Sequence, residues 1–234
     1  MIRSSVIKLV LTCEHGGHQV PSPLKYLEKV QPLNFDSHYT WDPGALEATQ
    51  FLSQKLKAPY FANTSSRLLI DCNRSDNNPK RFPRWTKKLK ASERQAIEKL
   101  VCDSYKSKVR THVKKLLSRG HFVVVISVHS FTPVLNGKRR ETELGVLYRP
   151  FVNTESDLAS ALVTHLKNFS NFKIHHNRPY QGHTDCFLNE LFREFKNPQF
   201  TGVMFELNYG LLSSKKSWDE LQWALATAVK AVLA

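Results

Sequence analysis

The chain has 234 residues, of which 41% are hydrophobic and 23% charged, and its formal net charge is +14. This composition is typical of an ordinary soluble globular protein that is long enough to close a core. A membrane protein is excluded, because no stretch approaches the roughly 20 apolar residues that a bilayer span requires. We expect one α/β domain over residues 1–234.

The positive charge suits either a nucleic-acid partner or the attraction of anionic substrates. The basic residues are scattered, with the densest cluster at 80–88 inside a polar segment, 77–90, that we expect to be a surface loop. Because no nucleic-acid-binding motif accompanies them, nucleic-acid binding is the less favoured interpretation. The four cysteines form no CxxC pair, and the first apolar run is followed at once by Glu14 and His15, unlike a signal peptide. A reduced, cytoplasmic protein is expected.

Apolar periodicity predicts strands and helices that alternate along the chain. Strands are expected at 6–12, 58–62, 122–128, 144–148, 172–175 and 202–208. Helices are expected at 44–56, 92–119 (with Ser92 as N-cap), 155–169, 186–195 and 218–233, with a short one around 24–30. The alternation favours a single-domain three-layer α/β/α fold with a mixed, mainly parallel sheet.

Four apolar runs end in, or contain, residues suited to chemistry. They carry Glu14-His15-Gly16-Gly17-His18, Asp71-Cys72-Asn73-Arg74 (after the run 68–70), His129-Ser130 and Glu206. Because the carboxyl ends of parallel strands meet at one edge of a sheet, these groups are expected to converge there.

Each group alone also has an ordinary explanation. The His-x-x-His loop could be solvated, His129 could be a buried histidine bonded to a carbonyl, and 71–74 could be an ion-paired turn. Glu206 is harder to explain in this way, because burying a carboxylate is costly and raises its pKa, which suits a general base. Together the groups suggest zinc hydrolysis, with three protein ligands, a carboxylate base and an arginine for the substrate carboxylate.

The sequence also resembles the N-formylglutamate amidohydrolase family, which is related to the zinc carboxypeptidase and aspartoacylase superfamily. The similar segments, in order, are 13–21 (CEHGGHQVP), 41–45 (WDPGA), 66–74 (SRLLIDCNR), 128–130 (VHS), 143–145 (ELG) and 206–208 (ELN). The resemblance implies a phosphorylase/hydrolase-like α/β fold and a zinc-activated water.

The resemblance also implies the metal ligands. His15 and His129 would bind zinc. The superfamily has a glutamate ligand three residues after the first histidine, but this chain has His18 there. The middle ligand therefore stays open between His18, by spacing, Glu14, by chemistry, and Asp42.

The remaining site residues are implied in the same way. Asn73 and Arg74 would hold the substrate carboxylate, and Glu206 would be the general base. Tyr180 would line the pocket. Apart from the resemblance, we expect an arginine, for which Arg67 is the candidate, to help zinc to stabilise the oxyanion.

The expected activity is metal-dependent hydrolysis of a small anionic N-acyl amino acid, with N-formylglutamate as the type substrate. The alternatives are a zinc peptidase or peptidoglycan-type amidase of the same fold, and a basic nucleic-acid-binding relative that has lost the chemistry. Zinc is the expected cofactor, and no membrane partner is expected.

Overall fold

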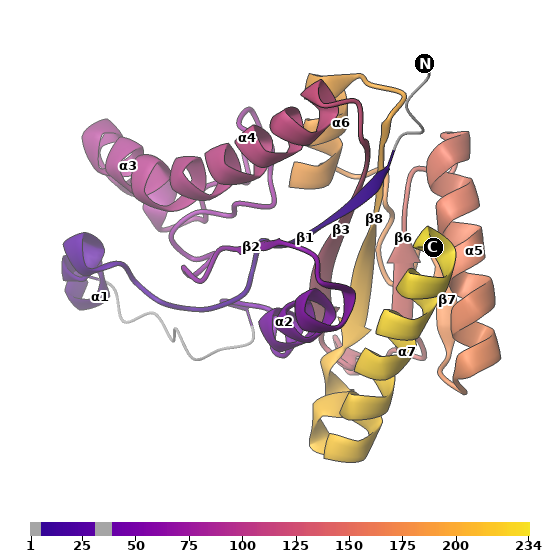
Figure 1. Ribbon diagram of the computed structural model, residues 1–234. Coiled ribbons are helices and arrows are strands. Elements are labelled where there is room, and N and C mark those ends of the chain that lie inside the picture. Colours follow the sequence, from indigo (N-terminus) through magenta and orange to yellow (C-terminus); the bar gives the residue numbers. More distant parts are fainter. Residues whose placement is uncertain (1–5, 31–38) are drawn as a thin grey trace.

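The computed structural model describes residues 6–30 and 39–234, and a six-stranded sheet forms its centre (Figure 1). In spatial order the strands are β2 (Tyr60–Ala62), β1 (Ile7–Cys13), β3 (Phe122–Phe131), β8 (Phe200–Asn208), β6 (Leu144–Leu147) and β7 (Ile174–His176). Neighbouring strands pair in parallel, except that β6 and β8 are antiparallel. The expected mixed, mainly parallel sheet is therefore confirmed. A hairpin of β4 (Val134–Leu135) and β5 (Lys138–Arg139) lies apart from this sheet.

Helices cover both faces of the sheet. One face packs against α2 (Ala45–Leu56), α5 (Asn153–Phe169) and α7 (Lys215–Leu233). The other packs against α1 (Tyr26–Val30), α3 (Ala91–Ile97), α4 (Ser104–Ser118) and α6 (Phe187–Phe195). Short turns of helix are η1 (Ser22–Leu24), η2 (Thr86–Lys88), η3 (Glu98–Asp103) and η4 (Tyr209–Ser213).

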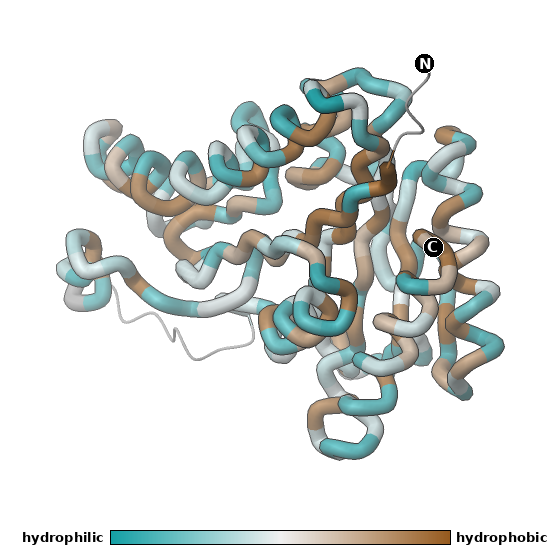
Figure 2. Tube along the Cα trace, viewed as in Figure 1, coloured by the Kyte–Doolittle hydropathy of each residue, from teal (hydrophilic) through white to brown (hydrophobic). Residues whose placement is uncertain are grey.

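The core consists of two apolar clusters, one on each face of the sheet. Every residue of β8, and every residue of β3 after Phe122, is buried, because both strands are covered from two sides. The helices contribute stripes at helical spacing, such as Tyr105, Val109 and Val113 on α4. Figure 2 shows these hydrophobic segments running through the interior of the molecule.

Two segments differ in detail from what their sequence pattern suggests. The apolar run 68–70 forms a turn, because Leu69 N–H bonds to the carbonyl of Ser66 and Asp71 N–H to that of Arg81. The helix expected at 92–119 begins at Ala91, since Glu93 accepts a hydrogen bond from Lys90 N–H and makes Lys90 the N-cap.

That long helix is also interrupted by a π-helical turn, η3, between α3 and α4. The wider turn shifts the apolar stripe, so that Val101 and Cys102 are buried side by side before the stripe resumes at Tyr105. The segment 77–90 is a loop as expected, apart from the short helical turn η2, and Arg81 and Thr86 within it are buried.

All four cysteines are buried and free. Over residues 6–30 and 39–234, no helix is both long and apolar enough to span a bilayer.

Candidate active site

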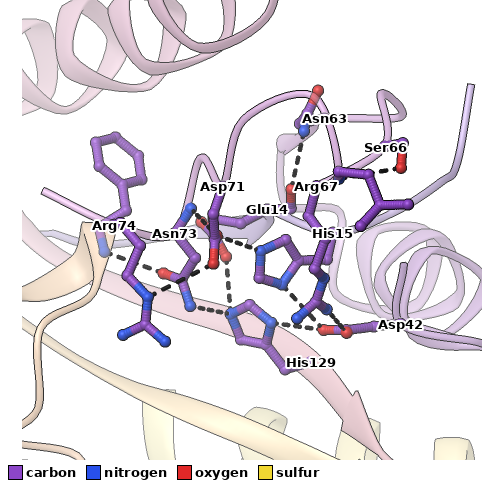
Figure 3. A network of polar contacts seen from close by, with 12 residues as sticks. Glu14, His15, Asp42, Asn63, Ser66, Arg67, Asp71, Asn73, Arg74 and His129 are labelled. Atoms are coloured by element: carbon purple, nitrogen blue, oxygen red, sulfur yellow. Dashed lines mark hydrogen bonds and ion pairs between the residues drawn. The ribbon is translucent and has the colours of Figure 1, made fainter. Parts of the chain in front are cut away.

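Two histidines face one carboxylate at the carboxyl ends of β1 and β3 (Figure 3). His15 follows β1, His129 lies near the end of β3, and Asp42 lies three residues before α2. The Nδ1 atoms of His129 and His15 are 2.8 Å and 3.4 Å from Asp42 Oδ2. The Asp42 N–H donates to the His15 carbonyl at 2.9 Å, which fixes the loop before α2 against the end of β1.

The outer nitrogen of each imidazole contacts a second carboxylate. His15 Nε2 is 2.7 Å from Asp71 Oδ1, and His129 Nε2 is 3.1 Å from Glu14 Oε2. Such partners hold the proton on Nε2 and fix the ring, which leaves Nδ1 able to bind a metal. Both rings therefore present Nδ1 to the same point beside Asp42.

This group satisfies the requirements of a metal site. Potential ligand atoms of His15, Asp42 and His129 all lie within 4.8 Å of one another, and each residue is at most 4% exposed. Two imidazoles and a carboxylate, with no thiolate, are the ligands of a catalytic zinc ion more often than of a structural one. The donor set fits the expected metal.

Electrostatics at the centre also favour a cation. Burial alone would raise the pKa of Asp42, but Arg67 and His15 outweigh it and lower that pKa well below its usual value. Burial would lower the pKa of His129, yet hydrogen bonds to Asp42 and Glu14 raise it well above its usual value. Buried carboxylates around two imidazoles leave a site in which positive charge is stabilised.

Among the three candidates for the middle ligand, only Asp42 lies between the two histidines. Glu14 lies on the outer side of His129, where it also accepts hydrogen bonds from Ser127 Oγ (2.6 Å) and Tyr105 OH (2.7 Å). Burial would raise the pKa of Glu14, but His129 and these hydroxyl groups lower it to about 2. Glu14 is therefore placed to orient His129.

His18 is outside the group, and the expectation from its spacing is not met. After His15 the chain turns and runs beside 63–65, with Gly16 N–H bonded to Asn63 O and Gln19 N–H to Thr64 O. A Cβ on Gly17 would lie 2.5 Å from Thr64 O, so only glycine permits this close approach. The turn carries the His18 ring away to Trp41, at a centroid distance of 5.2 Å.

Glu206 and Arg67 complete the charged part of the site. Glu206 pairs in register with His129 across β8 and β3, so both side chains lie on one face of the sheet. Burial, with a contribution from Asp42, raises the pKa of Glu206 to about 7 despite His129 and Arg67. Arg67 donates through Nη2 to Asp42 Oδ1.

One side-chain atom of each of these two residues lacks a hydrogen-bond partner within the described part of the chain. These atoms are Glu206 Oε2 and Arg67 Nε, and both are buried. Both residues line a cavity of about 560 Å³, together with the three residues of the metal-binding group. A buried acceptor and a buried donor without partners need an explanation, and a bound substrate or water would supply it.

The residues expected to bind substrate line the same cavity. Asn73 Oδ1 accepts from Phe187 N–H at 3.0 Å, and its amide nitrogen is 3.2 Å from His129 Nε2. Arg74 donates through Nη1 to Asp185 O at 2.8 Å, and its side chain is 38% exposed. Tyr180 lies at the mouth and accepts from Arg140 at 3.2 Å.

Sequence reasoning did not find the supporting carboxylates. Asp71 and Glu14 were visible in the segments Asp-Cys-Asn-Arg and Cys-Glu-His, but their roles depend on which ring nitrogen they contact. Asp42 stood in Trp-Asp-Pro-Gly-Ala, and nothing in that segment showed that it lies between His15 and His129.

The fold and the site together define an α/β protein with a buried His–Asp–His group that could hold a metal ion, next to a carboxylate of raised pKa, an arrangement suited to hydrolysis. The model of the N-formylglutamate amidohydrolase family matches residues 7–213. The chain belongs to this family, and amide hydrolysis is the chemistry of its class. The resemblance seen in the sequence is thereby confirmed.

Solved structures agree in fold. A gene product of Agrobacterium tumefaciens is 27% identical, with a TM-score of 0.79 over 96% of this chain and 91% of that one. The N-formylglutamate amidohydrolase of Ralstonia eutropha JMP134 is 15% identical, with a TM-score of 0.69 over 99% of this chain and 94% of that one. Among curated proteins, none matches the sequence significantly.

Proposed function

We propose that this protein is a zinc-dependent amidohydrolase that cleaves a small N-acyl amino acid, of which N-formylglutamate is the type. The observation that carries the proposal is the pair of open atoms, Glu206 Oε2 and Arg67 Nε, in a cavity shared with a His–Asp–His group. One is an acceptor for a proton and the other a donor for developing negative charge, which are the two needs of amide hydrolysis.

His15, Asp42 and His129 would hold the metal. A zinc ion bound there would polarise the substrate carbonyl and make a water molecule more acidic. Asp71 and Glu14 keep the imidazoles oriented through their Nε2 atoms, and partners of this kind sustain metal affinity.

Glu206 would move the proton. A pKa raised toward neutrality by burial makes it both a competent base and a competent acid near pH 7. Oε2 of Glu206 takes a proton from the attacking water while the water oxygen forms a bond to the acyl carbon. The same proton then passes to the leaving nitrogen as the C–N bond breaks, giving a free amine and a carboxylic acid, which releases its remaining proton to solvent. Arg67 Nε is placed to donate to the carbonyl oxygen while that oxygen carries negative charge.

Substrate selection follows from the walls of the cavity. Arg74 presents a partly exposed guanidinium, the group best suited to a carboxylate, and Asn73 is fixed beside it by Phe187 N–H. A volume of about 560 Å³ is in the range of small-molecule sites and favours an amino-acid derivative over a polymer.

Elemental analysis combined with a substrate panel tests the proposal. We expect about one zinc ion per chain, and hydrolysis of N-formyl and N-acetyl amino acids that carry a free α-carboxylate. The matching α-carboxamides should be poor substrates, because they lack the anion for Arg74. Full activity in a metal-free preparation would contradict the proposal, as would equal turnover of acids and amides.

A further inference from the structure

Strand β2 is an edge strand of the sheet, and α2 and α4 lie on either side of it (Figure 1). A groove lies along this edge. It consists of two neighbouring cavities, of about 840 Å³ beside residues 57–59 and about 480 Å³ beside residues 60–65. Both cavities are lined by α2 on one side and α4 on the other. We call this feature the β2 groove.

The charge in the β2 groove is of one sign. Its cations are Lys8, Lys55, Lys57, Lys108, Arg119 and Lys230. Among the described residues that line it, none is Asp or Glu. No carboxylate of residues 6–30 and 39–234 is recorded in an ion pair with any of the six, whereas Arg67, Arg74 and Arg110 all have such partners. The groove therefore carries six cations without an ion-pair partner among the described residues, five in the first cavity and Lys108 in the second.

The groove also contains aromatic surface. Tyr60 on β2 is 40% exposed and lines the second cavity. Phe61, next to it, contacts the His112 ring of α4 at a centroid distance of 5.3 Å. A positively charged groove with an accessible aromatic ring is the combination that binds single-stranded nucleic acid, because each base has a face that can stack.

We propose that the β2 groove binds single-stranded nucleic acid, with phosphates on its lysines and arginine and a base on Tyr60. A duplex fits less well, because its bases are not free to stack on Tyr60. An added peptide strand fits less well too, since β2 has three residues and follows Pro59, which has no N–H to donate.

The fold gathers basic residues that are scattered in the sequence. The six cations come from positions 8, 55, 57, 108, 119 and 230, so they are scattered in sequence and gathered only in the fold. The binding is independent of amide hydrolysis, because none of the residues that line the candidate active-site cavity lines the groove.

Fluorescence anisotropy with a labelled oligo(dT) of about 12 nucleotides, a length within the site sizes of single-strand binders, tests the proposal on the full chain. We expect the logarithm of the binding constant to fall linearly with the logarithm of salt concentration. The triple variant Lys57→Gln, Lys108→Gln, Arg119→Gln should reduce the slope by about 2, at about 0.7 per lost phosphate contact.

The matched control removes three exposed cations elsewhere: Lys138→Gln, Arg139→Gln and Lys167→Gln. It lowers the net charge equally, so it should leave the slope nearly unchanged. An equal reduction of the salt slope in the two triple variants would show that binding follows net charge, and it would overturn the proposal that the β2 groove is the binding site. Both variants should keep the wild-type melting temperature, because the substituted side chains are exposed.

Tyr60 separates a nucleic acid from other polyanions. Tyr60→Ala should weaken oligo(dT) binding about fivefold or more at constant salt slope, and Tyr60→Phe should restore it. A duplex of equal length should bind more weakly. Absence of oligo(dT) binding, or an unchanged affinity in Tyr60→Ala, would overturn the proposal. So would poly-glutamate binding of equal strength that Tyr60→Ala does not affect.

Discussion

Two networks of charged side chains lie on either side of the segment 71–76, and they differ in whether the hydrogen-bonding atoms of their central side chains are satisfied. The first is the candidate active site around Asp42. The second surrounds Lys106 on α4, whose side chain is 1% exposed. Its ammonium group donates to Arg74 O (2.7 Å), Asp76 Oδ1 (3.1 Å) and Glu190 Oε2 (2.7 Å).

The Lys106 network leaves no donor of its ammonium unused, since three N–H groups have three acceptors. Glu190 is shared with Arg110, which also bonds to Glu194 at 2.8 Å. The ammonium of Lys106 thus fixes the positions of α4, α6 and the chain after Arg74. The active-site cluster is more deeply buried, yet Glu206 Oε2 and Arg67 Nε have no hydrogen-bond partner among the described residues.

This contrast indicates where chemistry can occur in this protein. Burial of charge alone does not mark a functional site, because the ammonium of Lys106 is buried as well. The site is distinguished by polar atoms left without partners at the wall of a cavity, which cost stability unless a ligand satisfies them. Substitutions in the first network should therefore affect turnover, and substitutions in the second should affect stability.

The largest effect is expected for Asp42→Ala. It removes the carboxylate between His15 and His129, so zinc content should fall from about one ion per chain to nearly none and activity to background. His18→Ala is the control and should keep both. Elemental analysis and turnover of an N-acyl amino acid measure the outcome; loss of zinc in His18→Ala with retention in Asp42→Ala would reverse our assignment.

Glu206→Gln should keep the metal and lower kcat by a factor of about 10² to 10⁴, because the amide cannot accept the proton of water. Its free energy of unfolding should not fall, since the variant no longer buries an acidic group without a partner. Glu141→Gln, at an exposed glutamate near the same edge, is the control for kcat. Retained kcat in Glu206→Gln would remove Glu206 from the mechanism.

Lys106→Met should lower the free energy of unfolding by about 3–5 kcal/mol, because Glu190 and Asp76 lose their buried counter-charge. Lys108→Met, an exposed neighbour on the same helix, should change it by less than about 0.5 kcal/mol. Urea unfolding followed by circular dichroism measures both variants. Equal stability of the two would mean that the network around Lys106 is not structural.

The smallest effect concerns acid stability. Burial would raise the pKa of Asp76, but Lys106, with Arg81 and Arg110, lowers it. A lowered folded-state pKa contributes stability that is complete above the unfolded value of about 4 and is lost as pH falls through the folded value. Because Asp76 is half exposed, the contribution should stay below about 1 kcal/mol. Below about pH 4, wild type should therefore lose stability more steeply than Asp76→Asn; parallel curves would contradict this.

Much of the fold could be predicted because it follows from local pattern. The apolar stretch at 122–128 specified β3, and the spacing at 44–56 and 155–169 specified α2 and α5. Local pattern was also misleading in one place. Residues 68–70 are as apolar as a strand, yet their hydrogen bonds close a turn.

The candidate site divides in the same way. His15, His129 and Glu206 could be selected because they stand at or near the ends of buried strands, and the structure brings all three to one cavity. The third metal ligand, between His15 and His129, could not be selected from the sequence. His18 and Glu14 are near His15 in sequence, but the direction of the turn after His15 depends on its pairing with 63–65.

Periodicity and motifs are properties of short segments, so the alternation of strands and helices, the family and the strand-end residues could be inferred from the sequence. The place of Asp42 between the histidines, the unpartnered atoms of Glu206 and Arg67, and the gathering of six scattered cations along one groove became visible in the folded chain. These are relations between segments distant in the chain, and they arise from how helices pack on the sheet.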